Sequence, residues 1–313
     1  MQNFFVNPLT YDDSPDPFVC YAHGDYYAVF CSGERGCSVS VSKSKKLQDV
    51  FKTDKKIVYQ SELPNYAFNH WAPELHYFEG TWYIYTCADD GVNHHHRVVV
   101  LKGTTQSPQD SFVFAGVLDT GDYYSIDASP FIAPNGKLYL MWSSSKKKGV
   151  DNPCQLYIEE MESPVTMKNP GERHMVCGIE YSWEGTVNEG SAILIKNGKL
   201  YVSYSANAYT HPEYCLGLLA CFNADCADYK EWTWHKTSTP ILSQIEGLYG
   251  PGHNSFTVSP DGKEDWIVYH AKPSAEVSDY RVACAQPVSW NGDNPVFQRP
   301  VPFGTPILEP SEG

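Results

Sequence analysis

Apolar and polar positions alternate in short stretches along most of the chain, and turn residues separate these stretches. In the segment 125–145, apolar side chains recur at Leu138, Leu140 and Trp142, directly after a Pro-Asn-Gly turn at 134–136. A period of two predicts a half-buried β-strand, and the turn predicts a hairpin with the apolar pair that precedes it. A helical period of 3.6 residues is almost absent from the chain. The pattern therefore predicts an all-β protein.

A glycine followed by a strand rich in Tyr and Trp recurs five times. The copies are GDYYAVF, GTWYIYT, GKLYLMW, GKLYVSY and GKEDWIVYH, which begin at Gly24, Gly80, Gly136, Gly198 and Gly262. These glycines lie 56, 56, 62 and 64 residues apart, and a further strand-like run follows each copy. Five similar units of short strands predict a five-bladed β-propeller with four antiparallel strands per blade. A β-sandwich or a solenoid is the alternative, but a closed ring leaves no end blade exposed.

The five units account for the whole chain, and no linker-like segment interrupts them. We therefore expect residues 1–313 to form a single catalytic domain. The 37 acidic residues outnumber the 23 basic ones, the net charge is −14, and the longest basic run is 146–148. This balance weighs against nucleic acid and anionic membranes as partners.

Neither a membrane-spanning run of about 18 apolar residues nor the cationic start and apolar core of a signal peptide is found in the sequence. We expect a soluble chain that is either cytoplasmic or secreted with its signal removed, and the oligomeric state stays open. The ten cysteines are scattered without a CxxC pair, which favours buried reduced thiols over a disulfide framework and argues against zinc.

The innermost strand of each blade precedes the repeat glycine and lines the central channel of a propeller. Counting back eight or nine residues from the five glycines reaches one residue in each unit: Asp16, Trp71, Asp127, Glu189 and His253. A propeller would bring these five side chains together near its axis.

Three carboxylates gathered in a partly desolvated pocket repel one another, so their pKa values should separate. A protonated and an ionised carboxyl group side by side supply a general acid and a general base. Hydrolysis of a glycosidic bond requires such a pair, with inversion at a separation of roughly 6.5–9.5 Å and retention at about 5 Å. The pattern therefore favours a glycosidase over a non-catalytic glycan-binding propeller, which would not need three carboxylates.

The segments around these positions closely resemble glycoside hydrolase family 43. They are PDPF with Asp16, WAPEL at 71–75, SIDASPF with Asp127, NEGSAIL with Glu189, and GPGHNSF at 250–256. The resemblance covers essentially the whole chain and implies a five-bladed propeller with an inverting mechanism. It also implies that Asp16 is the general base, Glu189 the general acid, and Asp127 the residue that tunes and orients the acid. Arg281 matches the arginine that family members place against the terminal sugar.

The phrases NHWAPEL, HHHRVVVL, YCLGLLACF and AQPVSWNGDNPVF look most like the α-L-arabinofuranosidase branch. The resemblance implies an exo-acting enzyme that removes terminal arabinofuranose from α-1,5-linked arabinan or arabino-oligosaccharides, with arabinoxylan as a further substrate. β-Xylosidase and endo-arabinanase are the alternatives within the family.

Aromatic and histidine residues are the remaining site candidates. Trp71 is either core packing or a wall on which a sugar stacks, and Phe68 and His70 would complete that wall. His253 is either a satisfied buried histidine or, as the resemblance suggests, a residue below the active site that helps to hold water or a structural calcium ion. No cofactor is expected to be required. The run 94–96 of three histidines fits a loop at the pocket rim better than a metal cluster, because adjacent residues point in different directions.

Overall fold

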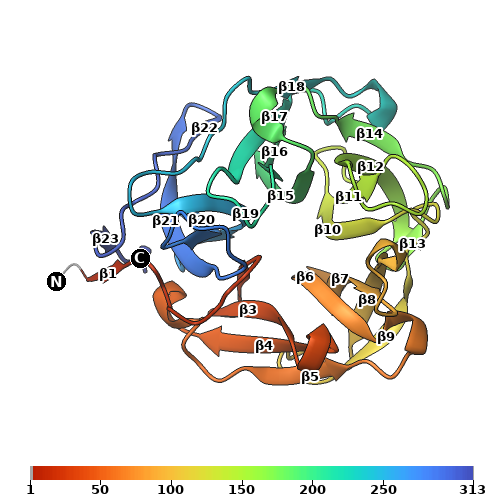
Figure 1. The fold of residues 1–313 in the computed structure, drawn as a ribbon, viewed down its shortest axis with the longest axis horizontal. Helices are drawn as coiled ribbons and strands as arrows, with labels where there is room; N and C mark the ends of the chain where they lie inside the picture. The colour runs from red at the N-terminus through yellow and green to blue at the C-terminus, as the bar shows by residue number, and fades with distance from the viewer. Residues whose placement is uncertain (1–2, 313) are drawn as a thin grey trace.

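A computed structural model describes residues 3–312, and it consists almost entirely of short antiparallel strands (Figure 1). The strands form five sheets that radiate from a central axis, in chain order around the ring. The predicted five-bladed β-propeller is confirmed. No helix among the described residues is long and apolar enough to cross a membrane.

Each blade runs from an innermost strand at the channel to an outer strand at the periphery. Blade 1 comprises β2 (Phe18–Ala22), β3 (Asp25–Ser32), β4 (Ser38–Ser44) and β5 (Lys56–Gln60), and blade 2 comprises β6 (Phe68–Phe78), β7 (Thr81–Asp89), β8 (Arg97–Gly103) and β9 (Phe112–Val117). Blade 4 comprises β15 (Asn188–Lys196), β16 (Lys199–Ala206), β17 (Cys215–Cys221) and β18 (Trp234–Lys236), and blade 5 comprises β19 (Tyr249–Val258), β20 (Asp265–Lys272), β21 (Val282–Asn291) and β22 (Asn294–Val296).

Blade 3 departs from the four-strand pattern. Its inner strands are β10 (Ser125–Ile132), β11 (Leu138–Ser145) and β12 (Cys154–Ser163). Two short strands, β13 (Thr166–Met167) and β14 (His174–Cys177), then both pair with β12. The outer position of this blade is therefore divided between two segments.

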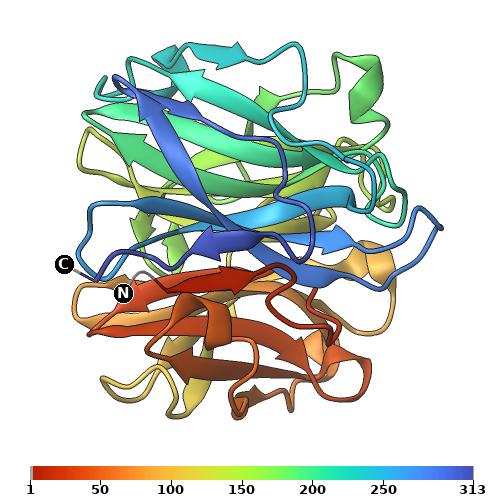
Figure 2. The ribbon, with the colours of Figure 1, turned by 90° about the vertical axis from the view of Figure 1, so that its left-hand side faces the viewer.

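A separate two-stranded sheet lies where blade 5 meets blade 1. It pairs β1 (Phe4–Val6) with β23 (Pro306–Leu308), and the two strands lie together at the edge of the ring (Figure 2). Phe5 of β1 packs against Trp266 of blade 5 at a ring separation of 6.0 Å. Segments from both ends of the described chain thus cover the seam between the last and the first blade.

The five repeat glycines occupy the turns between the first and second strands of the blades. All five have a left-handed φ, between 70° and 81°. At Gly198 an added Cβ would meet nothing within 4 Å, so the conformation and not the available space explains glycine there. Asn197 before it has a φ of 48°, and two left-handed residues in sequence suit the tight turn of a β-hairpin.

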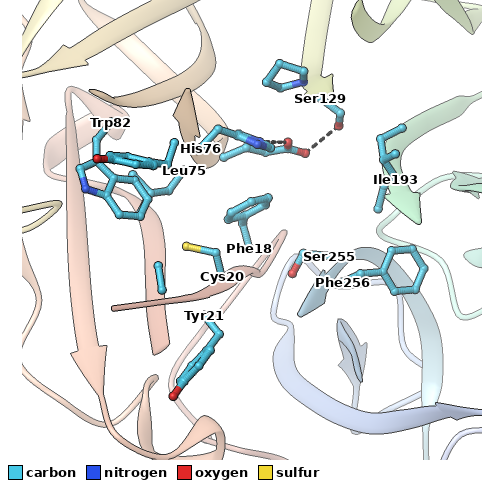
Figure 3. Close-up of a pocket in the computed structure, with 15 residues that line it drawn as sticks. Phe18, Cys20, Tyr21, Leu75, His76, Trp82, Ser129, Ile193, Ser255 and Phe256 are labelled. Carbon is cyan, nitrogen blue, oxygen red and sulfur yellow. Dashed lines mark hydrogen bonds and ion pairs between the residues drawn. The ribbon is translucent and has the colours of Figure 1, made fainter. Parts of the chain in front are cut away.

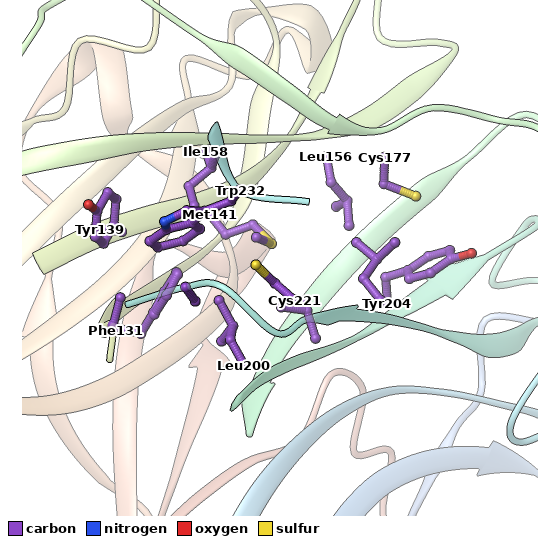
Figure 4. Close-up of a cluster of buried hydrophobic side chains, with 14 of the residues drawn as sticks. Phe131, Tyr139, Met141, Leu156, Ile158, Cys177, Leu200, Tyr204, Cys221 and Trp232 are labelled. Carbon is purple, nitrogen blue, oxygen red and sulfur yellow. The ribbon is translucent and has the colours of Figure 1, made fainter. Parts of the chain in front are cut away.

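Apolar side chains fill the space between neighbouring blades. Between blades 3 and 4, buried Tyr139, Leu156 and Leu200 belong to one such cluster, shown in Figure 4. Four further clusters fill the other inter-blade spaces. Burial of one large apolar side chain contributes roughly 1.5–3 kcal/mol, so these clusters hold the blades together. The ten cysteines are free.

The innermost strands are irregular at one level of the channel. In blades 2 to 5 the pairing register of the innermost strand shifts at this level. A β-bulge adds a residue to one strand and re-aims the neighbouring side chains, and such bulges are frequent beside active sites. The residues with left-handed φ at this level are Asp16 (49°), Ala72 (41°), Asp127 (53°), Gly190 (57°) and His253 (40°).

Candidate active site

A cavity of about 350 Å³ opens at one end of the central channel. The five residues that the repeat predicts at one level all line it: Asp16, Trp71, Asp127, Glu189 and His253. Arg281, which lies directly before β21, also lines this cavity. The ring of blades therefore brings together side chains that are far apart in the sequence.

Cationic and polar groups surround the carboxylate of Asp16. Its Oδ1 accepts a hydrogen bond from Arg281 Nη1 at 2.8 Å and lies 3.3 Å from His253 Nδ1. Its backbone N–H donates to His270 Nδ1 at 3.2 Å. Burial alone would raise the pKa of Asp16, but the charge of Arg281, assisted by that of His253, outweighs burial and holds this pKa well below its usual range. Asp16 is therefore ionised at neutral pH.

Asp127 and Glu189 retain protons more strongly than isolated carboxyl groups do. Burial raises the pKa of Asp127 to about 6, and burial together with the charge of Asp127 raises the pKa of Glu189 to about 8. The backbone N–H of Gly190 donates to Asp127 Oδ2 at 3.0 Å, which ties the chain next to Glu189 to Asp127. Between these two pKa values Asp127 is charged while Glu189 carries a proton.

His253 lies 3.3 Å from Asp16 and also senses the charges of Asp127 and Glu189. Burial lowers the pKa of His253, but the negative charges of Asp16 and Asp127 outweigh burial and raise it. Its ring packs on Gly190, where an added Cβ would lie only 3.0 Å from His253 Nδ1. Because Gly190 also has a φ of 57°, both the close approach and the conformation call for glycine at this position.

The surroundings of His253 do not resemble a calcium site. Calcium prefers a shell of six to eight oxygen ligands, whereas this ring offers nitrogen and lies beside Arg281 and Asp16. Within residues 3–312, no three or more His, Cys, Asp and Glu side chains form a group that could hold a metal ion. The residues present therefore do not fit a calcium ion, and no chemical step below depends on a metal.

Tyr214 and His270 support the carboxyl groups from behind the cavity. The hydroxyl of fully buried Tyr214 donates to Glu189 Oε1 at 2.8 Å. Its ring stacks on His270, with ring centroids 5.4 Å apart and an interplanar angle of 11°. His270 Nδ1 accepts the N–H of Asp16, and burial lowers the pKa of His270 to about 3, so this ring stays neutral. One stacked pair thus contacts both Asp16 and Glu189.

Trp71 is 36% exposed and forms a wall of the cavity. Its indole stacks on His96, with ring centroids 4.2 Å apart and an interplanar angle of 29°. His96 is fully buried and its Nδ1 donates to the carbonyl oxygen of Asn93 at 2.7 Å. Of the three histidines expected at the pocket rim, this one lies beneath Trp71 and supports its ring.

Phe68 and His70 do not reach the cavity. His70 is fully buried, its Nδ1 lies 2.9 Å from the carbonyl oxygen of Gly36, and neither residue lines the cavity. The Phe68 ring carries the guanidinium of Arg35 at 3.8 Å. Both residues belong to the same strand as Trp71, and the expectation that they complete its wall is wrong.

Several residues near the carboxyl groups follow no repeat signal. Tyr214 lies just before β17 and His270 lies on β20, so neither belongs to an innermost strand. Lys55 and Tyr209, which also line the cavity, come from loops. For this group, the sequence carries a signal for Tyr214 alone. Gly252 in GPGHNSF packs against the Tyr214 ring, and because an added Cβ would lie 2.3 Å from Tyr214 Cε1, this position calls for glycine.

Known proteins resemble the chain in both sequence and structure. The model of the glycosyl hydrolases family 43 matches residues 5–296. An extracellular exo-α-(1→5)-L-arabinofuranosidase of Streptomyces avermitilis is 34% identical over 97% of this chain, which spans 65% of that protein's length. A protein of the same name from Streptomyces chartreusis is 31% identical over 87% of this chain and 84% of its own length. The crystal structure of an α-L-arabinofuranosidase from Lactobacillus brevis matches with a TM-score of 0.86 and 30% identity, over 96% of this chain and 98% of that one.

Proposed function

The chain belongs to family 43 of the glycosyl hydrolases, and we propose that it is an inverting, exo-acting α-L-arabinofuranosidase. Its substrates would be the terminal arabinofuranosyl residues of α-1,5-linked arabinan or arabino-oligosaccharides, and arabinoxylan would be a further source. Support for the sugar comes from the activities for which the relatives are named, two of which are exo-α-(1→5)-L-arabinofuranosidases. We treat residues 1–313 as one catalytic domain.

The opposite protonation of Asp16 and Glu189 in one cavity is the observation that carries the proposal. Arg281 and His253 favour the ionised form of Asp16, whereas burial and the charge of Asp127 favour the protonated form of Glu189. A site that only binds glycans gains nothing from this difference. An inverting glycosidase needs one carboxylate and one carboxylic acid at the same pH.

The proposed reaction needs only these groups and water. Asp16 accepts a proton from a water molecule while the water oxygen attacks the anomeric carbon of the terminal sugar. Glu189 donates its proton to the glycosidic oxygen as the bond between that oxygen and the anomeric carbon breaks. Asp16 ends protonated and Glu189 ionised, and exchange with solvent restores both. Asp127 keeps Glu189 protonated beforehand through its negative charge.

Trp71 and Arg281 are the proposed contacts to the terminal sugar. An exposed indole face on the cavity wall suits the apolar face of a sugar ring. The guanidinium of Arg281 has further donors beyond the one that bonds Asp16, and these suit sugar hydroxyl groups. His253 contributes through the charge that it places beside Asp16.

Two amide variants test the catalytic assignment. Asp16→Asn and Glu189→Gln keep the shapes of the side chains but remove base and acid, so kcat on p-nitrophenyl α-L-arabinofuranoside should fall by about 10²–10⁴-fold. Glu276→Gln, at an exposed position, is the matched control and should keep full activity. Near-normal turnover by either cavity variant would disprove the assignment.

The product profile tests the substrate and the mode of action. Linear α-1,5-arabino-oligosaccharides should yield monosaccharide from the earliest time, with β-arabinofuranose as the first anomer detected by proton NMR. Short oligosaccharides as first products would indicate an endo-arabinanase. Faster cleavage of the p-nitrophenyl β-D-xyloside than of the arabinofuranoside would indicate a β-xylosidase.

A further inference from the structure

A second cavity, of about 300 Å³, lies farther along the same channel. We call it the distal cavity. All five blades contribute to it, through residues two to four positions beyond those of the catalytic level: Phe18 follows Asp16, Glu74 follows Trp71, Ser129 follows Asp127, Ile193 follows Glu189, and Ser255 follows His253. Figure 3 shows Ser129, Ile193 and Ser255 around the Phe18 ring. The volume is within the range of small-molecule sites, which begins at about 300 Å³.

A hydrogen-bonded carboxylate forms one wall of the distal cavity. Glu74 Oε2 lies 2.8 Å from His76 Nε2, and Glu74 Oε1 accepts a hydrogen bond from Ser129 Oγ at 2.7 Å (Figure 3). Each carboxylate oxygen has a second lone pair, so both can accept another hydrogen bond. The proposed reaction uses neither Glu74 nor His76, and their placement needs another explanation.

Aromatic rings form much of the remaining lining of the distal cavity. Phe18 occupies the middle of the lining, with its ring centroid 5.1 Å from that of His76, and Tyr21 and Phe256 lie around it (Figure 3). Tyr77 also lines the cavity. Tyr77 is 41% exposed, and its hydroxyl donates to Gln106 Oε1 at 2.8 Å, which fixes the ring. Ring faces next to hydrogen-bond acceptors bind a ligand that has both an apolar face and hydroxyl groups.

The charges of the lining exclude an anion, and its few ligand groups exclude a metal ion. None of the lining residues is a lysine or an arginine, so an anion would meet only the carboxylate of Glu74. Glu74 and His76 alone are too few ligands for a metal ion. Because the Glu74 oxygens are already engaged with His76 and Ser129, their remaining lone pairs point to hydroxyl donors.

We propose that the distal cavity is a second binding site, for one neutral sugar ring, which stacks on Phe18 and donates hydroxyl hydrogen bonds to Glu74. A layer of backbone separates this site from the catalytic cavity. Ser255 Oγ donates to the carbonyl oxygen of Pro17 at 3.0 Å, and Ser129 Oγ lies against the carbonyl oxygen of Ser191. The distal site therefore binds its sugar independently of the catalytic site. The choice of arabinose as a probe rests on the proposed function, whereas the cavity does not.

Titration calorimetry with free L-arabinose tests the second site. The Trp71→Ala background weakens binding in the catalytic cavity, so the remaining heat reports the distal cavity. In this background, Phe18→Leu keeps the apolar volume but removes the ring, and should reduce the affinity at least tenfold. Glu74→Gln should also weaken binding, because it replaces an acceptor with a donor. Phe222→Leu removes an exposed ring outside the cavity and should leave the affinity unchanged.

Three results would overturn the proposal. The first is that Trp71→Ala binds neither L-arabinose nor D-xylose. The second is that neither Phe18→Leu nor Glu74→Gln changes the affinity for the sugar. The third is that the protein binds ethylamine but neither sugar. Thermal unfolding checks that each variant is folded. If Phe18→Leu does not fold, the affinity of Glu74→Gln for the sugar decides whether the proposal holds. Turnover of p-nitrophenyl α-L-arabinofuranoside by the unmodified protein is measured separately. If the proposed function is wrong, the unmodified protein does not hydrolyse this substrate. If the distal site does not bind sugar, only the titration shows it.

Discussion

The hydroxyl of Tyr214 donates a hydrogen bond to Oε1 of Glu189 at 2.8 Å, and both groups lie in the interior of the propeller. This hydrogen bond lowers the pKa of Glu189, whereas burial and the charge of Asp127 raise it. Burial and the charge of Asp127 favour its protonated form, whereas a hydrogen bond donated to its oxygen favours the carboxylate. Tyr214 and Asp127 therefore set the pKa of the proposed acid in opposite directions, and the two can be tested separately.

Tyr214→Phe should move the alkaline limb of the pH–rate profile to higher pH. The variant removes a group that favours ionised Glu189, so the pKa of Glu189 rises above its value of about 8. We expect kcat to fall about tenfold as well, because one oriented hydrogen bond is worth roughly 1–2 kcal/mol. The measurement is kcat from pH 4 to 10.

Tyr229→Phe is the matched control for this variant. Tyr229 is also buried and donates to a carboxylate, Glu159 Oε2, at 2.6 Å, but it lies in the apolar cluster between blades 3 and 4. The Tyr229→Phe variant should have a lower unfolding temperature, and the alkaline limb of its pH–rate profile should not move. An unmoved limb in Tyr214→Phe would show that the tyrosine has only a structural role.

Asp127→Asn should move the alkaline limb to lower pH. Without the negative charge of Asp127, ionisation of Glu189 becomes easier and its pKa falls, by about one unit for an interaction of about 1.4 kcal/mol. The amide that replaces the carboxylate has nearly the same shape, and its oxygen could still accept the N–H of Gly190. The pH profile is compared with that of Asp225→Asn, an exposed position outside the cavity. A shift to higher pH, or none, would contradict the role assigned to Asp127.

Gly252→Ala should reduce kcat to a similar extent as Tyr214→Phe. An added Cβ would lie 2.3 Å from the Tyr214 ring, so the ring must move and its hydroxyl loses Glu189. Gly178→Ala is the control, because its added Cβ has no neighbour closer than 3.8 Å and its φ is not left-handed. If the rates of both variants match that of the unmodified protein, Gly252 does not determine the position of Tyr214.

Glu189→Gln should stabilise the fold at alkaline pH. The pKa of Glu189 is raised from 4.5 to about 8 on folding, so the folded state binds this proton more tightly than the unfolded state does. The resulting stabilisation is complete below the unfolded pKa and is lost as pH rises through the folded pKa. Glutamine does not titrate and avoids this loss.

Thermal unfolding at pH 5 and pH 9 measures the effect. The unfolding temperature of Glu189→Gln relative to the unmodified protein should increase by a few degrees between the two pH values. Glu276→Gln, which changes an exposed carboxylate, should show no such trend. A constant difference would mean that Glu189 titrates with an ordinary pKa.

The sequence alone determined the propeller and the level of its site. Strand alternation and five glycine-marked repeats are local features, because a hairpin turn with a left-handed glycine forms in the same way in every blade. Counting back eight residues from the first glycine and nine from each of the others reaches equivalent points at the innermost strands. Asp16, Trp71, Asp127, Glu189 and His253 accordingly all line one cavity.

Only the tertiary structure decided which other side chains reach that cavity. His70 is next to Trp71 but is buried against the carbonyl oxygen of Gly36, because successive side chains on a strand point to opposite faces. Tyr214 and His270 come from outside the innermost strands. Tyr214 meets Glu189 within blade 4, and His270 meets Asp16 where blade 5 packs against blade 1.

The protonation of the carboxyl groups also depends on that packing. Asp16 and Glu189 have similar intrinsic acidities, and the sequence predicts that their pKa values differ but not which neighbours cause it. Arg281 reaches Asp16 from 265 residues away, whereas Glu189 is buried beside another carboxylate. Charges act through space, so the surroundings that separate the pKa values of Asp16 and Glu189 exist only in the folded ring.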